Sequence, residues 1–506
     1  MKKNVLALSI AAMVGGFAGA ASAQTFPNTG MVAPTGTTLE LNDKGAGNIL
    51  IVPYATSADS NVSVMHVVNT DTVHGKAVKV RYRGAANSDD ILDFTVFLSP
   101  GDVWTGYTAT DADGPYFQTD DKSCAYPVEA FRDSANKPIK VRFSGARLAE
   151  GAKVNNLQES YVEILNMADI NKTVGGVTSE MWKSTKHVNG VAPCDPATLD
   201  KILNINPTDS ASVQAAADLG FDTPSGGLTG DWYILNVDKT TTFSGSATAV
   251  RVAGADTRGN FVLFPQAASN VAVNAGNVAA LTADPLLAIA NPGMALDFDA
   301  PDLSTPYLPA LATPSDQANS LTSQLSSKGV MNQFALDKSI SALTDWTLSM
   351  PTRRYSVAYD YTKTGDAGRV FNPLVTTFTA GNTTVRKNAD GENLICVTTG
   401  SNTFWDREEF EKTNNGSVSP IPVATKIPFC GEVAVLKFAD QSVLGASVTA
   451  SKVSLPGEFE NGWGTINYGT DLPLLGSSFI KLFNAGGLAN GFSGSYGITW
   501  EHRFTK

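Results

Sequence analysis

The stretch over residues 61–106 constrains the fold of this chain more than any other part of its sequence. Its middle segment alternates apolar with cationic side chains: Val78, Val80 and Tyr82 against Lys79, Arg81 and Arg83. Because side chains alternate between the two faces of a strand, this pattern predicts a strand with one buried face and one solvent face. Turns rich in Asn, Asp and Gly separate it from apolar segments on either side, so three consecutive antiparallel strands are expected.

Similar alternating segments recur along the chain, and they predict a mainly β fold of antiparallel β-sandwich domains with short helical insertions. Residues 24–46 are rich in Thr, Gly and Pro, and they are expected to form an extended N-terminal arm. The remaining divisions are an N-terminal β-sandwich domain over 47–265 with a helical insertion near 195–219, an irregular and helical connection over 266–345, and a C-terminal β-rich domain over 346–506.

The first residues have the pattern of a secretory signal peptide. Lys2 and Lys3 precede an apolar run over residues 5–20, and Ala21-Ser22-Ala23 places small side chains at the cleavage site. The run is short and contains Gly, and no stop-transfer flank follows it, which disfavours a membrane anchor. We expect residues 1–23 to be removed on export, so that the mature chain acts at the cell surface, on the outer membrane or in the medium.

The chain contains four cysteines: Cys124, Cys194, Cys396 and Cys430. An even number in an exported protein predicts disulfides, and the positions separate into an early and a late pair. We therefore expect Cys124–Cys194 and Cys396–Cys430. A zinc site is disfavoured because no C-x-x-C spacing occurs and the four histidines are scattered.

The formal net charge of −11 argues against nucleic acid as a partner. Four acids gather after the predicted strands: Asp111, Asp113, Asp120 and Asp121. Oxygen ligands packed in a loop can hold calcium, although the third alternating ligand and the terminal Glu of an EF-hand are missing. The alternative is a solvated acidic loop, and the same two interpretations apply to a second group: Asp297, Asp299 and Asp302.

Catalytic motifs are absent from the sequence: it has no G-x-S-x-G elbow, H-E-x-x-H helix, P-loop or G-x-G-x-x-G. A Ser-His-Asp triad would need one of the histidines to lie in a cleft beside a serine and an acid. Arg353, Arg354 and the segment FWDREE could form a sugar- or carboxylate-binding surface. The alternative is an ion-pair network between these arginines and Glu408 or Glu409.

The last predicted strand, YGITWEHRF, alternates aromatic with polar residues, as do the final strands of outer-membrane barrels. A large barrel, however, needs a regular succession of such segments, and the chain lacks one. A barrel or porin is therefore an alternative rather than the leading prediction.

Several segments resemble a family of secreted Gram-negative surface proteins that includes surface-layer proteins sheathing vesicle-bearing tubules called nanopods. They are VVNTDTVHGKAVKVRYRGAANSDDILDFTVFLSPGDVWTG, YVEILNMADI, PDLSTPY, TDWTLSMPTRRYSVAYDY and FWDREE. The resemblance implies self-assembly into a two-dimensional array on the outer membrane, often supported by divalent cations. It transfers no catalytic residues.

The leading hypothesis is therefore a non-enzymatic surface-layer protein whose partners are further copies of itself and outer-membrane components, with calcium as the one candidate cofactor. The alternatives are an outer-membrane barrel or porin, and a secreted polysaccharide-binding or hydrolytic protein. In the leading hypothesis, Lys79, Arg81 and Arg83 are candidates for contact with an acidic loop of the next subunit. A solvated strand face is the simpler interpretation of these three residues.

Overall fold

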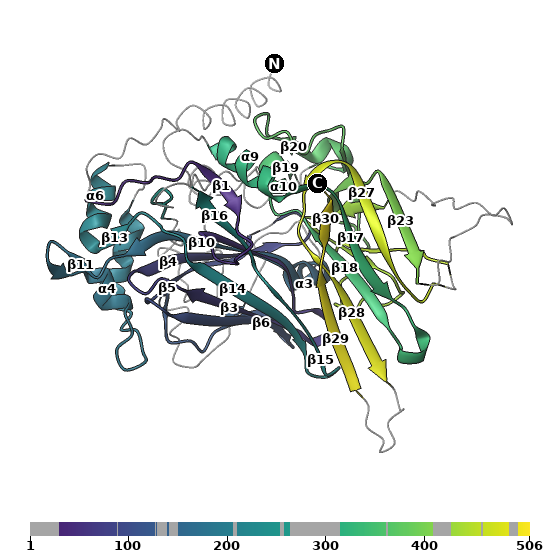
Figure 1. Cartoon of the computed structure of the whole chain (residues 1–506), viewed down its shortest axis with the longest axis horizontal. Coiled ribbons are helices and arrows are strands. Elements are labelled where there is room, and N and C mark those ends of the chain that lie inside the picture. Colours follow the sequence, from purple (N-terminus) through teal and green to yellow (C-terminus); the bar gives the residue numbers. More distant parts are fainter. Residues whose placement is uncertain are drawn as a thin grey trace.

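The computed structural model is mainly antiparallel β, which confirms the predicted fold class (Figure 1). It describes residues 30–88, 90–126, 128, 139–140, 150–205, 210–253, 258–263, 314–360, 363–407, 427–456, 459–484 and 494–505. Two sandwiches lie along the long axis of the molecule, with α4 (Glu180–Thr185) and α6 (Ser210–Leu219) at one end and β23 (Ser401–Asp406) at the other.

The first sandwich consists of two sheets, here called A and B. Sheet A has the order β1 (Thr38–Leu41), β16 (Thr248–Ala253), β2 (Ile49–Thr56), β10 (Glu159–Ile170), β4 (Gly75–Gly84), β5 (Asp90–Leu98) and β8 (Cys124–Tyr126), and β13 (Phe221–Asp222) also pairs with β10. Sheet B has the order β15 (Thr241–Ser246), β14 (Leu228–Asn236), β3 (Asn61–Asn69), β6 (Val103–Asp111), β7 (Gly114–Gln118) and β9 (Ile139–Lys140). Their facing side chains, among them Val80, Phe94, Trp104 and Trp232, form one apolar core.

The second sandwich consists of sheets C and D. Sheet C has the order β23, β27 (Asn461–Pro473), β17 (Ser326–Ala335) and β30 (Arg503–Thr505). Sheet D has the order β26 (Ala450–Lys452), β25 (Val433–Lys437), β18 (Leu343–Ser349), β28 (Ser477–Asn484) and β29 (Gly494–Glu501). Smaller ladders join β19 (Val357–Tyr359) to β20 (Arg369–Phe371), and β21 (Thr383–Lys387) to β22 (Asn393–Thr398) and β24 (Pro428–Cys430).

Helices cover the outer face of sheet A. Met181 of α4, Val213 of α6 and Leu321 of α9 (Pro314–Leu325) join the apolar cluster that contains Phe97 and Leu165 of the sheet. The predicted helical insertion is confirmed as α5 (Pro196–Leu199), η2 (Asp200–Asn204) and α6. The other short elements are α3 (Glu150–Gln158), α10 (Arg353–Ser356), η1 (Ala58–Ser60), η5 (Lys338–Ile340), η6 (Gly365–Gly368) and the hairpin of β11 (Thr173–Val174) and β12 (Val177–Thr178).

The three strands predicted over residues 61–106 exist, but they are not consecutive neighbours in one sheet. β4 pairs with β5, whereas β3 pairs with β6 and β14 in the opposite sheet. The turn at residues 70–74 therefore carries the chain from sheet B to sheet A. Local alternation and turn composition are the same for a hairpin and for this crossing, so the sequence pattern could not distinguish them.

The predicted solvent face of β4 is wrong. Lys79, Arg81 and Arg83 are only 0%, 3% and 3% exposed. β4 is an inner strand of sheet A, and its register places Arg81 opposite Glu163 of β10 and Asp93 of β5. As buried side chains, these three cations cannot reach a loop of a neighbouring subunit in this structure.

The second sandwich covers this face. Arg354 of α10 donates from Nη2 to both carboxylate oxygens of Glu163, at 2.9 and 3.0 Å, and Nε of Arg83 lies 3.7 Å from the same carboxylate. Arg353 pairs with Glu432 at 2.6 Å and donates from Nη2 to the carbonyl of Ala86 at 3.4 Å. The arginines thus link the two sandwiches, whereas Glu408 and Glu409, the predicted partners, lie outside the described residues.

The apolar core is continuous across the same boundary. Val433, Val435 and Phe479 of sheet D belong to the cluster that fills the first sandwich. Nearby, Glu159 of β10 accepts hydrogen bonds from the backbone N–H groups of Ser447 and Val448, at 2.8 and 3.0 Å. Burial raises the pKa of this carboxyl, and those bonds only partly oppose the effect.

Two predicted boundaries move. Within the irregular and helical connection predicted over 266–345, the helix α9 ends at Leu325 and β17 begins immediately afterwards at Ser326, so the second sandwich starts within the predicted connection. The described part of the N-terminal arm is extended, as expected, but its residues 38–41 form β1, which pairs with β16. In both places a long-range strand partner decides the conformation, and a local pattern carries no information about it.

Both predicted disulfides are confirmed. Cys124–Cys194 joins β8 to the segment before α5, with a Cα–Cα distance of 5.3 Å. Cys396 and Cys430 are register partners in β22 and β24. Two disulfides fit an oxidising, extracytoplasmic compartment.

We expect Glu163→Gln to destabilise the protein by about 3–5 kcal/mol, because it leaves buried arginines without their carboxylate. Urea unfolding of the purified protein measures the change. Glu180→Gln is the matched control: Glu180 pairs with Lys201, both side chains are about half exposed, and its loss should cost less than about 1 kcal/mol. Equal small effects of the two substitutions would contradict the structural role of Glu163.

Candidate functional site

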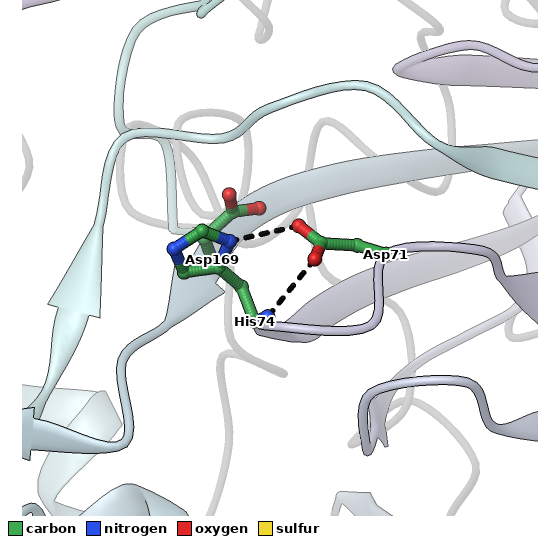
Figure 2. Close-up of side chains that lie close together, drawn as sticks. All are labelled: Asp71, His74 and Asp169. Atoms are coloured by element: carbon green, nitrogen blue, oxygen red, sulfur yellow. Dashed lines mark hydrogen bonds and ion pairs between the residues drawn. The ribbon is translucent and has the colours of Figure 1, made fainter.

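One group of metal-ligating side chains comes together in the described part of the chain: Asp71, His74 and Asp169 (Figure 2). One ligand atom of each lies within 4.8 Å of the others. Asp71 and His74 come from the turn that leads from β3 to β4, and Asp169 lies near the end of β10. The sequence indicated the turn but not the arrival of Asp169 beside it.

Lysine already supplies the positive charge at this group. The buried ammonium of Lys76 lies 2.9 Å from Asp169 Oδ1, 3.8 Å from Asp71 Oδ2 and 3.0 Å from Ser225 Oγ. Arg258 adds a second cation, 3.6 Å from Asp169 Oδ2. Arg258 also lies 4.0 Å from Asp222 Oδ2, so three acids share these two cations, and the carboxylates of the group already have cationic partners without a metal ion.

Asp71 also holds the turn together. Its Oδ1 accepts the backbone N–H group of Val73 at 2.7 Å. Figure 2 shows its two contacts with His74: Oδ1 accepts the backbone N–H group at 3.0 Å, and Oδ2 accepts from Nδ1 at 2.8 Å. Burial by itself would raise the pKa of Asp71, but these hydrogen bonds lower it below its usual value. The ionised carboxylate is therefore part of the turn.

The same network contains a serine beside a lysine, an arrangement that some hydrolases use. Ser225 Oγ, however, donates to Asp169 Oδ2 at 2.6 Å and accepts from the Lys76 ammonium. The hydroxyl of Ser225 thus directs its proton to Asp169 and not to the lysine nitrogen, whereas a catalytic base would have to accept that proton. The geometry is that of a structural ion-pair network.

His187 lies beside a serine and an acid, which is the arrangement that a hydrolytic function would require. Its Nδ1 is 3.1 Å from Ser99 Oγ and 3.2 Å from Asp102 Oδ2. A triad needs the acid on one ring nitrogen and the serine on the other, so that a proton can pass through the ring. Because both partners meet the same nitrogen, this cluster orients His187 but does not activate Ser99.

His502 has a structural role. It separates β29 in sheet D from β30 in sheet C, and its Nε2 donates to the carbonyl of Thr347 at 2.8 Å while its Nδ1 accepts from Asn332 at 2.9 Å. Burial lowers its pKa to about 4, and the Thr347 contact opposes that effect. The neutral ring therefore connects the two sheets of the second sandwich.

Asp345 of β18 is a second buried acid with a raised pKa, after Glu159 of β10. Its Oδ2 accepts from Ser442 Oγ at 2.5 Å and from the N–H of Leu444 at 3.1 Å. Burial raises its pKa to about 7, against the lowering effect of these bonds. The other oxygen, Oδ1, has no hydrogen-bond partner among the described residues, so nothing on that side stabilises the charged form of the carboxyl.

The four aspartates predicted to bind calcium do not form one site. Asp111 and Asp113 lie at the β6–β7 hairpin, where Asp111 Oδ1 accepts the N–H of Asp113 at 2.8 Å. Asp120 and Asp121 follow the far end of β7, a five-residue strand that is about 17 Å long. Hairpin geometry thus separates acids that the sequence places close together, and the second acidic group, at 297–302, lies outside the described residues.

Comparisons with known proteins add no relative: no family model, no curated protein and no solved structure matches the chain. Among the helices of the described residues, none combines the length and the apolar character needed to cross a bilayer.

The sequence pattern did not identify either polar cluster. The turn motif contains Asp71 and His74, and Ser99 stands close to Asp102, but their remaining partners are distant in sequence: Asp169 and His187. Nothing in the residue types around 169 or 187 distinguishes these partners from other polar side chains. An alignment showing that the pairs vary together would be the signal able to find them.

We expect Asp169→Asn to lower stability by about 3–5 kcal/mol, because it removes the carboxylate that holds Lys76. Neither Zn²⁺ nor EDTA should shift the thermal midpoint through this cluster. Differential scanning calorimetry of both proteins, with and without each reagent, tests this. A metal-dependent midpoint in the wild type that disappears in Asp169→Asn would show that the cluster is a metal site.

A second prediction concerns pH. Because the folded pKa of Asp345 lies above its usual 3.8, its contribution to stability is present at low pH and is lost as pH rises from about 4 to about 7. Asp345→Asn should remove that loss, so the variant gains on the wild type by about 2–4 kcal/mol between pH 4 and pH 8. His502 acts in the opposite direction in both proteins, since its stabilising contribution is lost as pH falls from 6.5 towards about 4.

Urea unfolding at a series of pH values measures the difference between the two proteins. Asp113→Asn, an exposed position, controls for the loss of one negative charge. A difference between Asp345→Asn and wild type that does not change with pH would contradict the raised pKa.

Proposed function

We propose that this protein is an exported structural component of a surface layer, assembling with copies of itself on the outer face of a Gram-negative envelope or on its vesicle tubules. The signal-peptide pattern and the two disulfides support export. The resemblance of its motifs to nanopod-type surface-layer proteins supports the array. In this proposal the protein has no enzymatic activity.

The observation that carries the proposal is the use of charged side chains between the two sandwiches. Arg354 with Glu163, and Arg353 with the carbonyl of Ala86, connect one sandwich to the other across a buried boundary. Together with the apolar core that continues across this boundary, such contacts favour one rigid body over two domains that close on a substrate. A rigid subunit is what a repeating lattice requires.

The margin of sheet D offers a surface for lattice contacts. In β29, Tyr496 is 63% exposed and Trp500 is 48% exposed, and Phe504 of β30 in sheet C is also exposed. Aromatic side chains that remain half exposed at the end of a sheet are typical of interaction surfaces. Within the proposal, this margin packs against a neighbouring subunit.

Calcium enters the proposal as a bridge between subunits. Asp111 with Asp113, and Asp120 with Asp121, form two separate acidic pairs, and calcium prefers six to eight oxygen ligands. Each pair alone supplies too few oxygens, so a neighbouring subunit would complete the shell. This bridge would also offset repulsion between chains of net charge −11.

We expect the purified mature protein to form ordered sheets in millimolar Ca²⁺ and to dissolve again in a chelator, as seen by negative-stain electron microscopy. The double variant Tyr496→Ala and Trp500→Ala should fold but fail to assemble. Val177→Ala is the matched control, because Val177 is an exposed apolar residue in the distant β11–β12 hairpin. A wild-type protein that stays monodisperse with calcium, together with envelopes that bear no lattice, would reject the proposal.

A further inference from the structure

The outer face of sheet C differs from the rest of the surface in composition. Register places its side chains in three rows across the strands: Trp405, Trp463 and Gln333; Thr403, Thr465, Met331 and Arg503; and Ser401 and Asn467. The opposite face, with Val330, Phe334 and Ile466, belongs to the core of the second sandwich. The three rows therefore face outward, at the end of the molecule opposite α4 and α6 (Figure 1).

Two stacked tryptophans dominate this face. The rings of Trp405 and Trp463 are nearly parallel, with an interplanar angle of 13° and centroids 4.2 Å apart. Trp463 nevertheless remains 42% exposed. Since Trp405 covers one side of the Trp463 ring from β23, the other side faces the β17 side of the sheet, where Gln333 is the register partner.

Polar groups surround the tryptophans. Gln333, Thr403 and Thr465 offer an amide and two hydroxyls, and no hydrogen bond of these side chains is found among the described residues. The rows contain one cation, Arg503, and no carboxylate, although the chain as a whole carries a net charge of −11. An exposed aromatic platform ringed by hydrogen-bonding groups suits a ligand with both an apolar face and hydroxyls.

The dimensions of the face suit a short run of sugar rings. Four strands spaced by about 4.8 Å and rows separated by about 7 Å place its side chains on a flat grid about 14 Å on each side. A flat platform of this size with an aromatic ring is sufficient to hold a few pyranose rings.

We propose that the outer face of sheet C binds polysaccharide, with a pyranose ring stacked on the free side of Trp463. The C–H face of the sugar covers the indole, and its hydroxyls bond to Gln333, Thr403 and Thr465. The guanidinium of Arg503 can pair with acidic groups of a polysaccharide that carries them. The exposed site lies on the monomer, so the inference goes beyond the proposed lattice and does not rest on it.

Affinity electrophoresis of the calcium-free protein tests the inference. The gels contain dextran, mannan, alginate or the polysaccharide released from smooth lipopolysaccharide by mild acid. We expect retardation in at least one gel, and Trp463→Ala should weaken that binding by at least about tenfold. Trp463→Phe should retain part of it, because a smaller aromatic ring still offers a face.

Two further variants keep the test decisive. Gln333→Ala, at an exposed position, should also weaken binding, and it serves if Trp463→Ala does not fold, as judged by near-UV circular dichroism. Trp500→Ala is the matched control: it removes an exposed tryptophan from sheet D and should leave retardation unchanged. Absence of retardation in every gel, or equal retardation of wild type, Trp463→Ala and Gln333→Ala, would overturn the inference.

The remaining possible result is that the outer face of sheet C is a contact between copies of this protein. Sedimentation velocity with calcium measures whether Trp463→Ala alters assembly. If that variant loses assembly but binds polysaccharide as the wild type does, the face is a contact between copies and the polysaccharide inference is wrong. If the wild type binds polysaccharide and forms no lattice, only the proposed function fails.

Discussion

The arrangement of the molecule depends on three carboxylates of one strand, β10. Glu159 and Asp169 are fully buried, and the side chain of Glu163 is only 12% exposed. Removing such groups from water is unfavourable unless each finds a cation or donors at hydrogen-bonding distance. Each finds them in a different remote segment: Glu159 at residues 447–448, Glu163 at Arg354 and Asp169 at Lys76.

These contacts have a common consequence. A buried carboxylate is satisfied only when its remote partner is correctly placed, whereas apolar surfaces tolerate many ways of packing. The apolar core that continues from the first sandwich to Val435 and Phe479 supplies the driving force for association. We infer that the hydrogen bonds of Glu159 and the ion pair of Glu163 select one docking geometry from those that the apolar contact alone would allow.

The same contacts explain which features the sequence could predict. Alternation in β4, the helix at 210–219 and both cysteine pairs are local or countable features, and all are present. The solvent face of Lys79, Arg81 and Arg83 was predicted from a rule that holds when nothing covers the strand. The residues that cover this strand are Arg354 and its neighbours, which lie far along the chain. The sequence around Arg354 does not indicate which strand it contacts. The polar clusters around Asp169 and His187 were missed for the same reason, since each is formed by segments that only the fold brings together.

Internal neutralisation of charge also determines what remains outside. Several side chains of reactive types make their contacts inside the protein. They include Lys76, His502 and Ser225. Among the described residues, two aromatic surfaces stay exposed: the Trp405–Trp463 stack on sheet C and the margin of β29 on sheet D. Because His502 joins sheet C to sheet D, and sheet D shares its core with the first sandwich, these surfaces hold a fixed relation to each other. When two binding surfaces belong to one rigid subunit, attachment through one surface fixes the orientation of the other. An ordered layer anchored to a polysaccharide would depend on this property.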